Sequence, residues 1–168
     1  FVVGFLNSSH CSFMFPEEIE LKCTAKDFLE KKVDSKYYLK EKGFKFVTSS
    51  KNRGRAKINA DIIRTEKRNQ QFNWNGDFVF EPLNTRKGEK PDNAYVGMYQ
   101  GQKGIARKLT PRECHRLMGF GDDFKIDTHD VDAYKQSGNS IVVNVLSGII
   151  DEILKVIRWL KLLQFLVE

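Results

Sequence analysis

The chain has 168 residues, 40% of them hydrophobic, and a formal net charge of +6 with a sequence pI near 9.2. This length and composition suffice for a buried core, which excludes a disordered or fibrous protein and allows one domain or a domain with a small lobe. The charge permits a polyanionic partner without requiring one. The three cysteines form neither an even disulfide framework nor a metal-ligand spacing. We therefore expect a reducing, cytoplasmic location and no metal site.

The first segment, Phe1 to Leu6, is a short apolar run that contains β-branched residues and ends at Asn-Ser-Ser. This pattern predicts a buried strand at the edge of a loop. The run is too short to cross a membrane and no charged region precedes it, so we expect neither a membrane span nor a signal peptide. Because the chain lacks an initiator methionine, we also expect a fragment or the downstream half of a longer protein.

Three short elements are predicted next, and we assign no chemistry to them. Thr24 to Asp27 has the spacing of a capping box and predicts a short helix that continues through Leu29. Residues 33–40 predict a second short helix. Residues 43–47 predict a strand.

The positive charge is concentrated between Lys51 and Gln70, where seven basic residues stand against two acidic ones, a net charge of +5. Arginine and lysine interleaved with serine, asparagine and glycine make a surface that can follow phosphates, and arginine can also reach guanine edges. A charge run that only faces water is the alternative. A second basic group lies in the loop-like stretch of residues 83–92. The candidate DNA-contacting residues are Lys51, Arg53, Arg55, Lys57, Arg64, Lys67, Arg68, Arg86 and Lys87.

The segment from Gln71 to Phe80 predicts a β-hairpin with Asn75-Gly76 at its tip. An odd loop of residues 75–77 would place four aromatic side chains on one face, and we expect them to pack as a core rather than stack on bases. These side chains are Phe72, Trp74, Phe78 and Phe80. A further strand is predicted over residues 94–99, followed by a glycine-rich turn at residues 101–104.

Thr110 to Glu113 predicts a helix start, with threonine at the cap, proline at the first helical position and glutamate at the third. Gly119 can end this helix. We interpret Cys114 as a small buried residue, and Arg112 and Glu113 as braces rather than as an acid and a base. His115 and His129 lack convincing partners for catalysis.

A glycine-centred turn at residues 138–140 leads into the apolar segment that begins at Ile141. Gly138 can adopt a conformation closed to other residues, and Asn139 or Ser140 can cap the following helix. Such a helix start offers free amides to a small polar ligand, although most turns of this kind only cap a helix. The helix is expected to run to Val167. It is apolar on several faces, which favours burial against a partner.

Two blocks of the chain, taken together, resemble the last two sequence motifs of cytosine-5 DNA methyltransferases. Residues 107–120 read Arg-Lys-Leu-Thr-Pro-Arg-Glu-Cys-His-Arg-Leu-Met-Gly-Phe, and residues 134–143 read Tyr-Lys-Gln-Ser-Gly-Asn-Ser-Ile-Val-Val. In that family an Arg-Lys-Leu-Thr/His-Pro-Arg-Glu-Cys block precedes Tyr-Lys-Gln-x-Gly-Asn-Ser-Val-Val. The resemblance is strong over the last third of the chain, weak over the first few residues and absent from the middle.

The resemblance implies an α/β fold: an incomplete S-adenosylmethionine-dependent methyltransferase domain with a small β-rich target-recognition lobe inserted. Residues 1–20 would be the last strand and exit segment of the catalytic domain, 21–105 the recognition lobe, and 106–168 the helices that return to the catalytic domain. The basic stretch would then contact double-stranded DNA. Gly138, Asn139, Ser140 and Ile141 would form part of the S-adenosyl-L-methionine pocket.

The family's chemistry requires a Pro-Cys-Gln nucleophile, a Glu-Asn-Val motif and a Phe-x-Gly-x-Gly cofactor loop, and this sequence contains none of the three. We therefore expect no catalytic residue here and no methyl transfer without an upstream half. The resemblance implies a subunit or C-terminal part of such an enzyme, in a restriction-modification system, that pairs with that half or self-associates through its apolar C-terminal helix. The alternative is a non-catalytic DNA-binding remnant.

Overall fold

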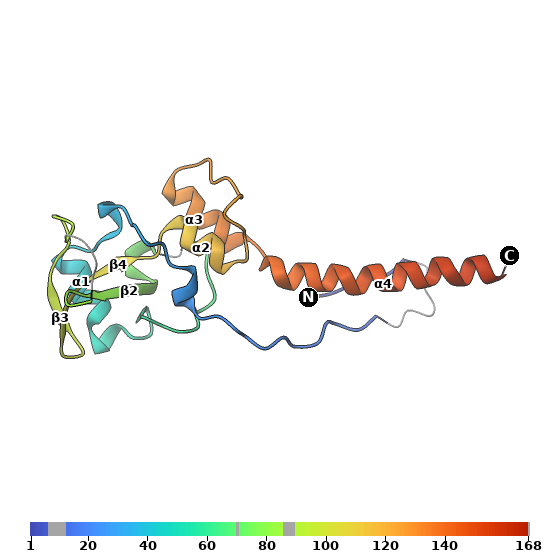
Figure 1. Ribbon diagram of the computed structural model, residues 1–168, viewed down its shortest axis with the longest axis horizontal. Helices are drawn as coiled ribbons and strands as arrows, with labels where there is room; N and C mark the ends of the chain where they lie inside the picture. Colours follow the sequence, from blue (N-terminus) through green and yellow to red (C-terminus); the bar gives the residue numbers. More distant parts are fainter. Residues whose placement is uncertain (7–12, 70, 86–89, 168) are drawn as a thin grey trace. The chain divides into compact units, whose positions relative to one another are not determined.

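The computed structural model describes residues 1–6, 13–69, 71–85 and 90–167, and beyond Arg158 it describes the backbone alone. The chain divides into two compact units, each with its own internal contacts (Figure 1). The larger unit, called the lobe below, is Leu21–Ser140. The smaller unit combines Phe1–Glu20 with Ile141–Glu168.

A four-stranded sheet with the strand order β1-β2-β4-β3 forms the centre of the lobe. β1 and β2 run parallel, whereas β4 is antiparallel to both β2 and β3. The strands are β1 (Ala56–Ile58), β2 (Gly76–Pro82), β3 (Gly97–Tyr99) and β4 (Gln102–Lys108). Gln100 and Gly101 join β3 to β4 with φ angles of +48° and +77°, which is the backbone of a tight two-residue hairpin turn. The turn therefore begins one residue before the predicted stretch of residues 101–104 and shares Gly101 with it.

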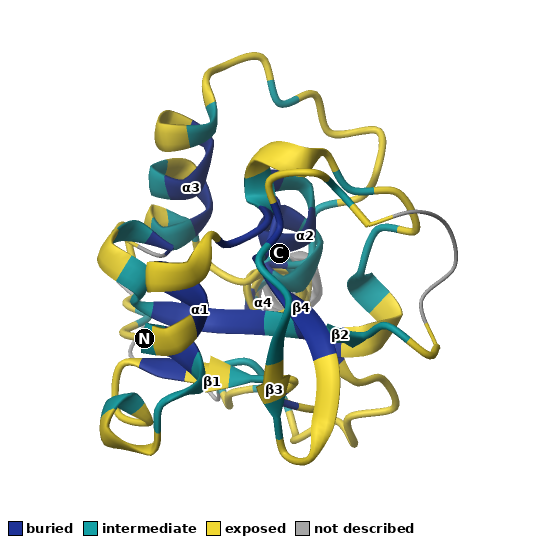
Figure 2. Ribbon diagram, turned by 90° about the vertical axis from the view of Figure 1, so that its left-hand side faces the viewer, coloured by how far each residue is buried: buried dark blue, intermediate teal, exposed yellow. Residues whose placement is uncertain are grey.

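The main core lies between β2, β4 and helix α1 (Glu41–Thr48), and Figure 2 shows the buried residues gathered there. The predicted strand over residues 43–47 is wrong, because these residues belong to α1. Phe44 and Val47 are three positions apart and both face the sheet, which is helical spacing. Phe44 packs against Phe80 with ring centroids 6.3 Å apart.

The predicted hairpin around Asn75-Gly76 is also wrong. Residues 72–74 form a single 3₁₀ turn, η4 (Phe72–Trp74), and Gly76 begins β2, which pairs with β1 and β4. Phe78 and Phe80 are buried in the main core, as expected for core aromatics, and Trp74 packs at its border. Phe72 belongs instead to a second cluster with Leu109 and Tyr134. The four aromatic side chains therefore do not share one face.

Helices α2 (Pro111–Leu117) and α3 (Asp130–Asn139) cover the second cluster. The predicted start of α2 is confirmed, since Thr110 and Glu113 form a capping box and Gly119 leaves the helix with a φ of +87°. The two short helices expected near the start of the lobe are single 3₁₀ turns, η1 (Ala25–Phe28) and η2 (Ser35–Tyr37). A third turn, η3 (Ser50–Asn52), follows α1.

In the smaller unit, the prediction of a long helix is confirmed by α4 (Val143–Val167), which has 25 residues. The predicted strand at residues 1–6 is wrong: these residues are coil, and Val2 and Leu6 are 99% and 92% exposed. A strand needs a neighbour to accept its backbone hydrogen bonds, and the described residues provide none here. Among the described helices, none has the length and apolar content that a membrane crossing requires.

Candidate nucleic-acid interface

A buried ion network fixes the junction between β4 and α2. The guanidinium of Arg107 donates to both carboxylate oxygens of Glu113, at 2.8 and 2.9 Å, and to Glu81 at 2.9 Å. Glu113 also accepts the backbone N–H groups of Thr110 and Glu30, each at 2.8 Å. Each oxygen of Glu113 thus receives two donors, and a buried carboxylate satisfied in this way locks the segments that donate to it. The interpretation of Glu113 as a brace agrees with this geometry.

The cysteine and histidine of α2 take structural positions. Cys114 is fully buried, and this burial raises the pKa of its thiol well above the usual value. The ring of His115 is buried, shares a hydrogen bond with the carbonyl of Pro111 at 2.8 Å, and stacks on Phe124 with centroids 5.5 Å apart. The burial of Cys114 agrees with its interpretation as a small buried residue, and His115 takes a packing position with the carbonyl of Pro111 as its hydrogen-bond partner.

Most of the basic residues proposed to meet DNA are exposed on the lobe. They follow α1 in chain order through η3 and β1, and continue in the segment before η4. The exposed members are Lys51, Arg53, Arg55, Lys57, Lys67 and Arg68. Arg86 and Lys87 lie outside the described residues. The exposed set keeps its cationic groups available to phosphates.

Arg64 differs from this set because its guanidinium is engaged within the lobe. Its guanidinium donates to the carbonyls of Gly54, Arg55 and Gly76 at 2.6–3.0 Å, and to Asp77 at 3.4 Å. These contacts use four of its five donors. Arg64 therefore ties the segment before β1 to the start of β2 and has one donor left for a ligand.

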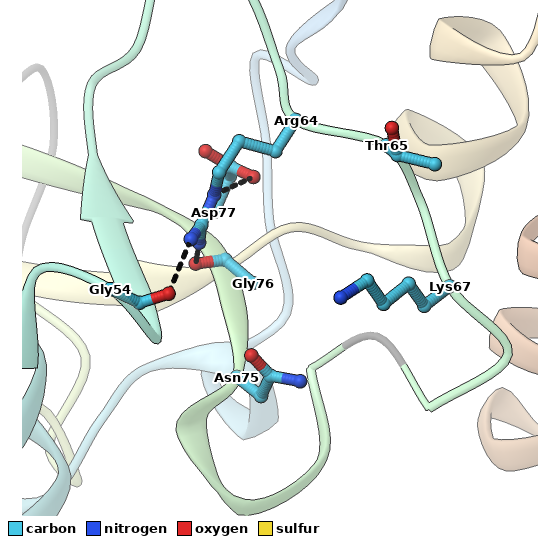
Figure 3. A pocket seen from close by; sticks show the side chains of 7 residues that line it. All are labelled: Gly54, Arg64, Thr65, Lys67, Asn75, Gly76 and Asp77. Carbon is cyan, nitrogen blue, oxygen red and sulfur yellow. Dashed lines mark hydrogen bonds and ion pairs between the residues drawn. The ribbon is translucent and has the colours of Figure 1, made fainter.

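A cavity of about 200 Å³ lies beside Arg64 (Figure 3). It is lined by Gly54, Arg64, Thr65, Lys67, Asn75, Gly76 and Asp77. Figure 3 shows the amine of Lys67 directed into the space opposite the Arg64–Asp77 pair. Burial raises the pKa of Asp77, although the neighbouring Arg64 opposes this shift. The Oδ1 atom of Asp77 is buried without a hydrogen-bond partner.

The turn proposed to hold the cofactor has a different conformation from the one expected. Gly138 and Asn139 complete the last turn of α3, and the N–H of Ser140 donates to Ser137 at 3.1 Å. The turn therefore ends a helix instead of capping the start of one, and α4 begins at Val143. Ile141 belongs to the smaller unit, where its side chain is 47% exposed.

Gly138 does not adopt a left-handed conformation, and its role is close packing. A Cβ atom at this position would overlap the backbone carbonyl group of Lys67 and lie 2.5 Å from the amide nitrogen of Arg68. Glycine is thus needed because α3 lies directly on the basic segment. The contact holds the backbone of Lys67 and Arg68 in place while their side chains stay exposed.

A buried carboxylate lies within the same basic segment. Glu66 is 9% exposed, and burial raises its pKa to about 7. Ser137 and Cys114 are near enough to oppose this shift in part, but neither forms a hydrogen bond of good geometry with the carboxylate. The sequence gives no signal for this burial, because a glutamate between arginines and lysines is typical of a solvated surface.

The family model described as C-5 cytosine-specific DNA methylase matches residues 1–155. Type II methyltransferase M.DsaV of Dactylococcopsis salina is 33% identical over 159 residues, which cover 94% of this chain and 42% of the relative. M.HpaII of Haemophilus parainfluenzae is 31% identical over 165 residues, covering 88% and 43%. The chain thus spans less than half the length of the curated relatives it matches.

Two solved structures share the fold. The Entamoeba histolytica methyltransferase EhMeth matches with a TM-score of 0.57 at 15% identity, covering 86% of this chain and 46% of that one. The S. pombe Dnmt2 methyltransferase matches with a TM-score of 0.55 at 21% identity, covering 83% and 44%. These similarities confirm the predicted α/β methyltransferase fold class. With a family match over most of its length, the chain belongs to the C-5 cytosine-specific DNA methylase family.

Proposed function

We propose that this chain is the C-terminal part of a cytosine-5 DNA methyltransferase of a restriction-modification system, acting in the cytoplasm. Residues 21–105 recognise the DNA target. Residues 106–168 return to the catalytic domain and supply one wall of the S-adenosylmethionine pocket, and residues 1–20 leave that domain. The observation that carries the proposal is the family match joined to an exposed row of cations on a rigid lobe.

Double-stranded DNA is a suitable ligand for this row of cations because the fold holds the backbone that carries them in place. Arg53 and Arg55 flank Gly54, whose carbonyl is tied to Arg64, and Lys57 follows on β1. Lys67 is positioned by the contact with Gly138. Cations on a fixed backbone lose little conformational freedom when they bind phosphates, which supports a specific surface over a solvated charge run.

The residues proposed for the cofactor can serve as one wall of a site. Asn139 exposes its carboxamide, and Ile141 exposes an apolar side chain. The hydroxyl of Ser140 donates to Ser137 at 2.7 Å, so it meets a ligand as an acceptor. These groups suit a ligand with polar and apolar parts. S-adenosylmethionine would bring the reactive methyl group, and the rest of its pocket would come from the missing motifs.

The upstream half is the partner that the apolar surfaces favour. Helix α4 exposes apolar side chains along its described length, and the coil at residues 1–6 is exposed as well. The exposed residues of α4 include Val145, Leu146, Ile150, Leu154 and Ile157. Such a surface is typical of an interface. It also suits self-association, which is the second candidate partner.

DNA recognition is tested by changing Arg53, Arg55 and Lys57 together to glutamine. Binding to a fluorescent duplex is measured by anisotropy at several salt concentrations. Loss of three phosphate contacts should weaken binding and make the slope of log K against log salt shallower by roughly 2–3. The matched control is glutamine at Lys31, Lys32 and Lys103, three exposed lysines outside the basic row. Equal slopes for the two variants would show that the row only faces water.

The role as a C-terminal part is tested by mixing. The purified chain alone should transfer no methyl group from radiolabelled S-adenosylmethionine to DNA. Activity should appear when it is mixed with an upstream methyltransferase half that carries the Pro-Cys-Gln, Glu-Asn-Val and Phe-x-Gly-x-Gly motifs. Methylation by the isolated chain would contradict the proposal. A stable but inactive mixture that still binds DNA would favour the non-catalytic remnant.

A further inference from the structure

A cavity of about 490 Å³ combines aromatic rings with cationic groups at one end of the sheet. It lies where β1 and β2 begin and β4 ends. Its lining residues are Phe46, Arg55, Asn73, Trp74 and Lys108. The volume falls within the range of small-molecule pockets, about 300–1,000 Å³. The sequence analysis did not predict that Phe46 or Trp74 would face a ligand.

The two aromatic side chains form a supported pair. The rings of Phe46 and Trp74 have centroids 5.2 Å apart and an interplanar angle of 40°. A Cβ atom added to Gly43 would lie 2.8 Å from the indole nitrogen of Trp74, so the indole rests on the backbone of α1. Both rings are only partly buried. The pair is thus fixed from behind and still lines the cavity.

The backbone that presents Trp74 is strained. Gln71, Asn73 and Trp74 have φ angles of +66°, +49° and +52°, a region that L-residues rarely adopt. Such a conformation persists only where the surrounding contacts fix it. Here Gln71 donates its N–H to Asn75 at 2.8 Å and its side-chain amide to Asp77 at 2.8 Å. Strain held in this way is typical of functional sites, since simple core packing does not require it.

The charges around the rings select the class of ligand. The guanidinium of Arg55 lies 5.2 Å from the ring centre of Phe46 and donates to the carbonyl of Asn73 at 3.2 Å. Lys108 is half-buried, and burial lowers the pKa of its amine. No carboxylate lies within ion-pair distance of Lys108 among the described residues, and none lines the cavity. The cavity therefore favours a flat, anionic ligand and disfavours a cation.

We propose that this cavity stacks an unpaired base of DNA on the exposed part of the Phe46–Trp74 pair, while Arg55 and Lys108 contact neighbouring phosphates. Paired bases in a duplex have both faces covered by their neighbours, so the site distinguishes an extrahelical or unpaired base from a fully paired one. Base–aromatic stacking contributes about 1–3 kcal/mol per base. This inference rests on the proposed function, because it assumes that the lobe meets DNA.

The test uses the whole chain with Trp159→Phe, which leaves Trp74 as the only tryptophan. Two duplexes of identical sequence are titrated, one fully paired and one with a single bulged base. We expect the bulged duplex to bind about 5- to 150-fold more tightly and to quench the fluorescence of Trp74. Equal affinities with unchanged fluorescence would overturn the inference.

Variants separate this site from general DNA binding. Trp74→Leu fills the space over Gly43 without an aromatic face, and it should abolish the preference while the salt dependence on paired DNA stays the same. Arg68→Gln removes an exposed cation outside the cavity and should retain the preference. If Trp74→Leu does not fold, Lys108→Met examines the same cavity and should weaken binding to the bulged duplex more than to the paired one.

The outcomes distinguish the two proposals. Salt-dependent binding to both duplexes without a preference would remove the stacking site and leave DNA recognition intact. Binding to neither duplex would overturn both. A preference that persists in the folded Trp74→Leu protein, or that is undiminished in the Lys108→Met protein, would place the unpaired base elsewhere and overturn the inference.

Discussion

Glu113→Gln should be the most destabilising conservative change in the lobe. The substitution keeps the size of the side chain but replaces one carboxylate oxygen with an amide that donates. Each oxygen of Glu113 receives two donors, so two of the four donors would lose their acceptor and Arg107 would lose half of its buried countercharge. An unsatisfied buried donor costs about 1–3 kcal/mol, and breaking a buried ion pair costs about 3–5 kcal/mol. We expect a loss of about 3–5 kcal/mol.

The assay is urea unfolding followed by circular dichroism, with the free energy of unfolding obtained by linear extrapolation. Asp122→Asn is the matched control, because Asp122 also forms a two-point contact with an arginine, Arg116, at 2.6 and 2.9 Å. That carboxylate is 67% exposed, so water screens the pair and its loss should change the free energy of unfolding far less than the loss of Glu113. Equal losses for the two variants would refute the idea that burial makes the network important.

Two further variants test the packing around the basic segment. Gly138→Ala should lower the free energy of unfolding by about 1–3 kcal/mol, because the new Cβ overlaps the backbone of Lys67. The control is Gly148→Ala in α4, where the new Cβ makes only an ordinary contact. This variant should be neutral or stabilising in the same urea assay. Burial raises the pKa of Glu66 from 4.5 to about 7, so the folded chain keeps this proton after the unfolded chain has lost it, and the free energy of unfolding falls as pH rises through that window. Glu66→Gln should therefore raise the free energy of unfolding by on the order of 3 kcal/mol at pH 8 and leave it nearly unchanged at pH 4. Equal effects of the substitution at the two pH values would contradict a raised pKa for Glu66.

Local signals in the sequence predicted the elements whose determinants lie within a few residues. The capping box at Thr110 and Glu113, with Pro111 between them and Gly119 beyond, specifies α2 without help from distant segments. The long apolar segment likewise predicted α4. The strand prediction for the residues of α1 was wrong because Phe44 and Phe46 alternate with Lys45, and such alternation is typical of a strand. Its true pattern depends on two partners, since Phe44 faces the sheet and Phe46 faces Trp74.

In the candidate site, too, only features determined by neighbouring residues could be predicted from the sequence. Exposure of Lys51, Arg53 and Lys57 was predictable from their polar neighbours. The role of Arg64 was not, because its carbonyl acceptors come from residues nine to twelve positions away. The cavity at Trp74 was equally hidden, since Phe46 and Lys108 reach it from α1 and β4. Residue types alone do not predict such contacts, because the residues are far apart in the sequence and come together only in the folded chain.

The edges of the sheet constrain how copies of this protein can associate. Its outer strands, β1 and β3, have three residues each, while the seven-residue strands β2 and β4 lie between them. A short outer strand presents few unpaired backbone groups to a second copy and so resists strand-by-strand polymerisation. Among the described residues, the apolar side chains of α4 are therefore a better candidate surface for assembly than the edges of the sheet.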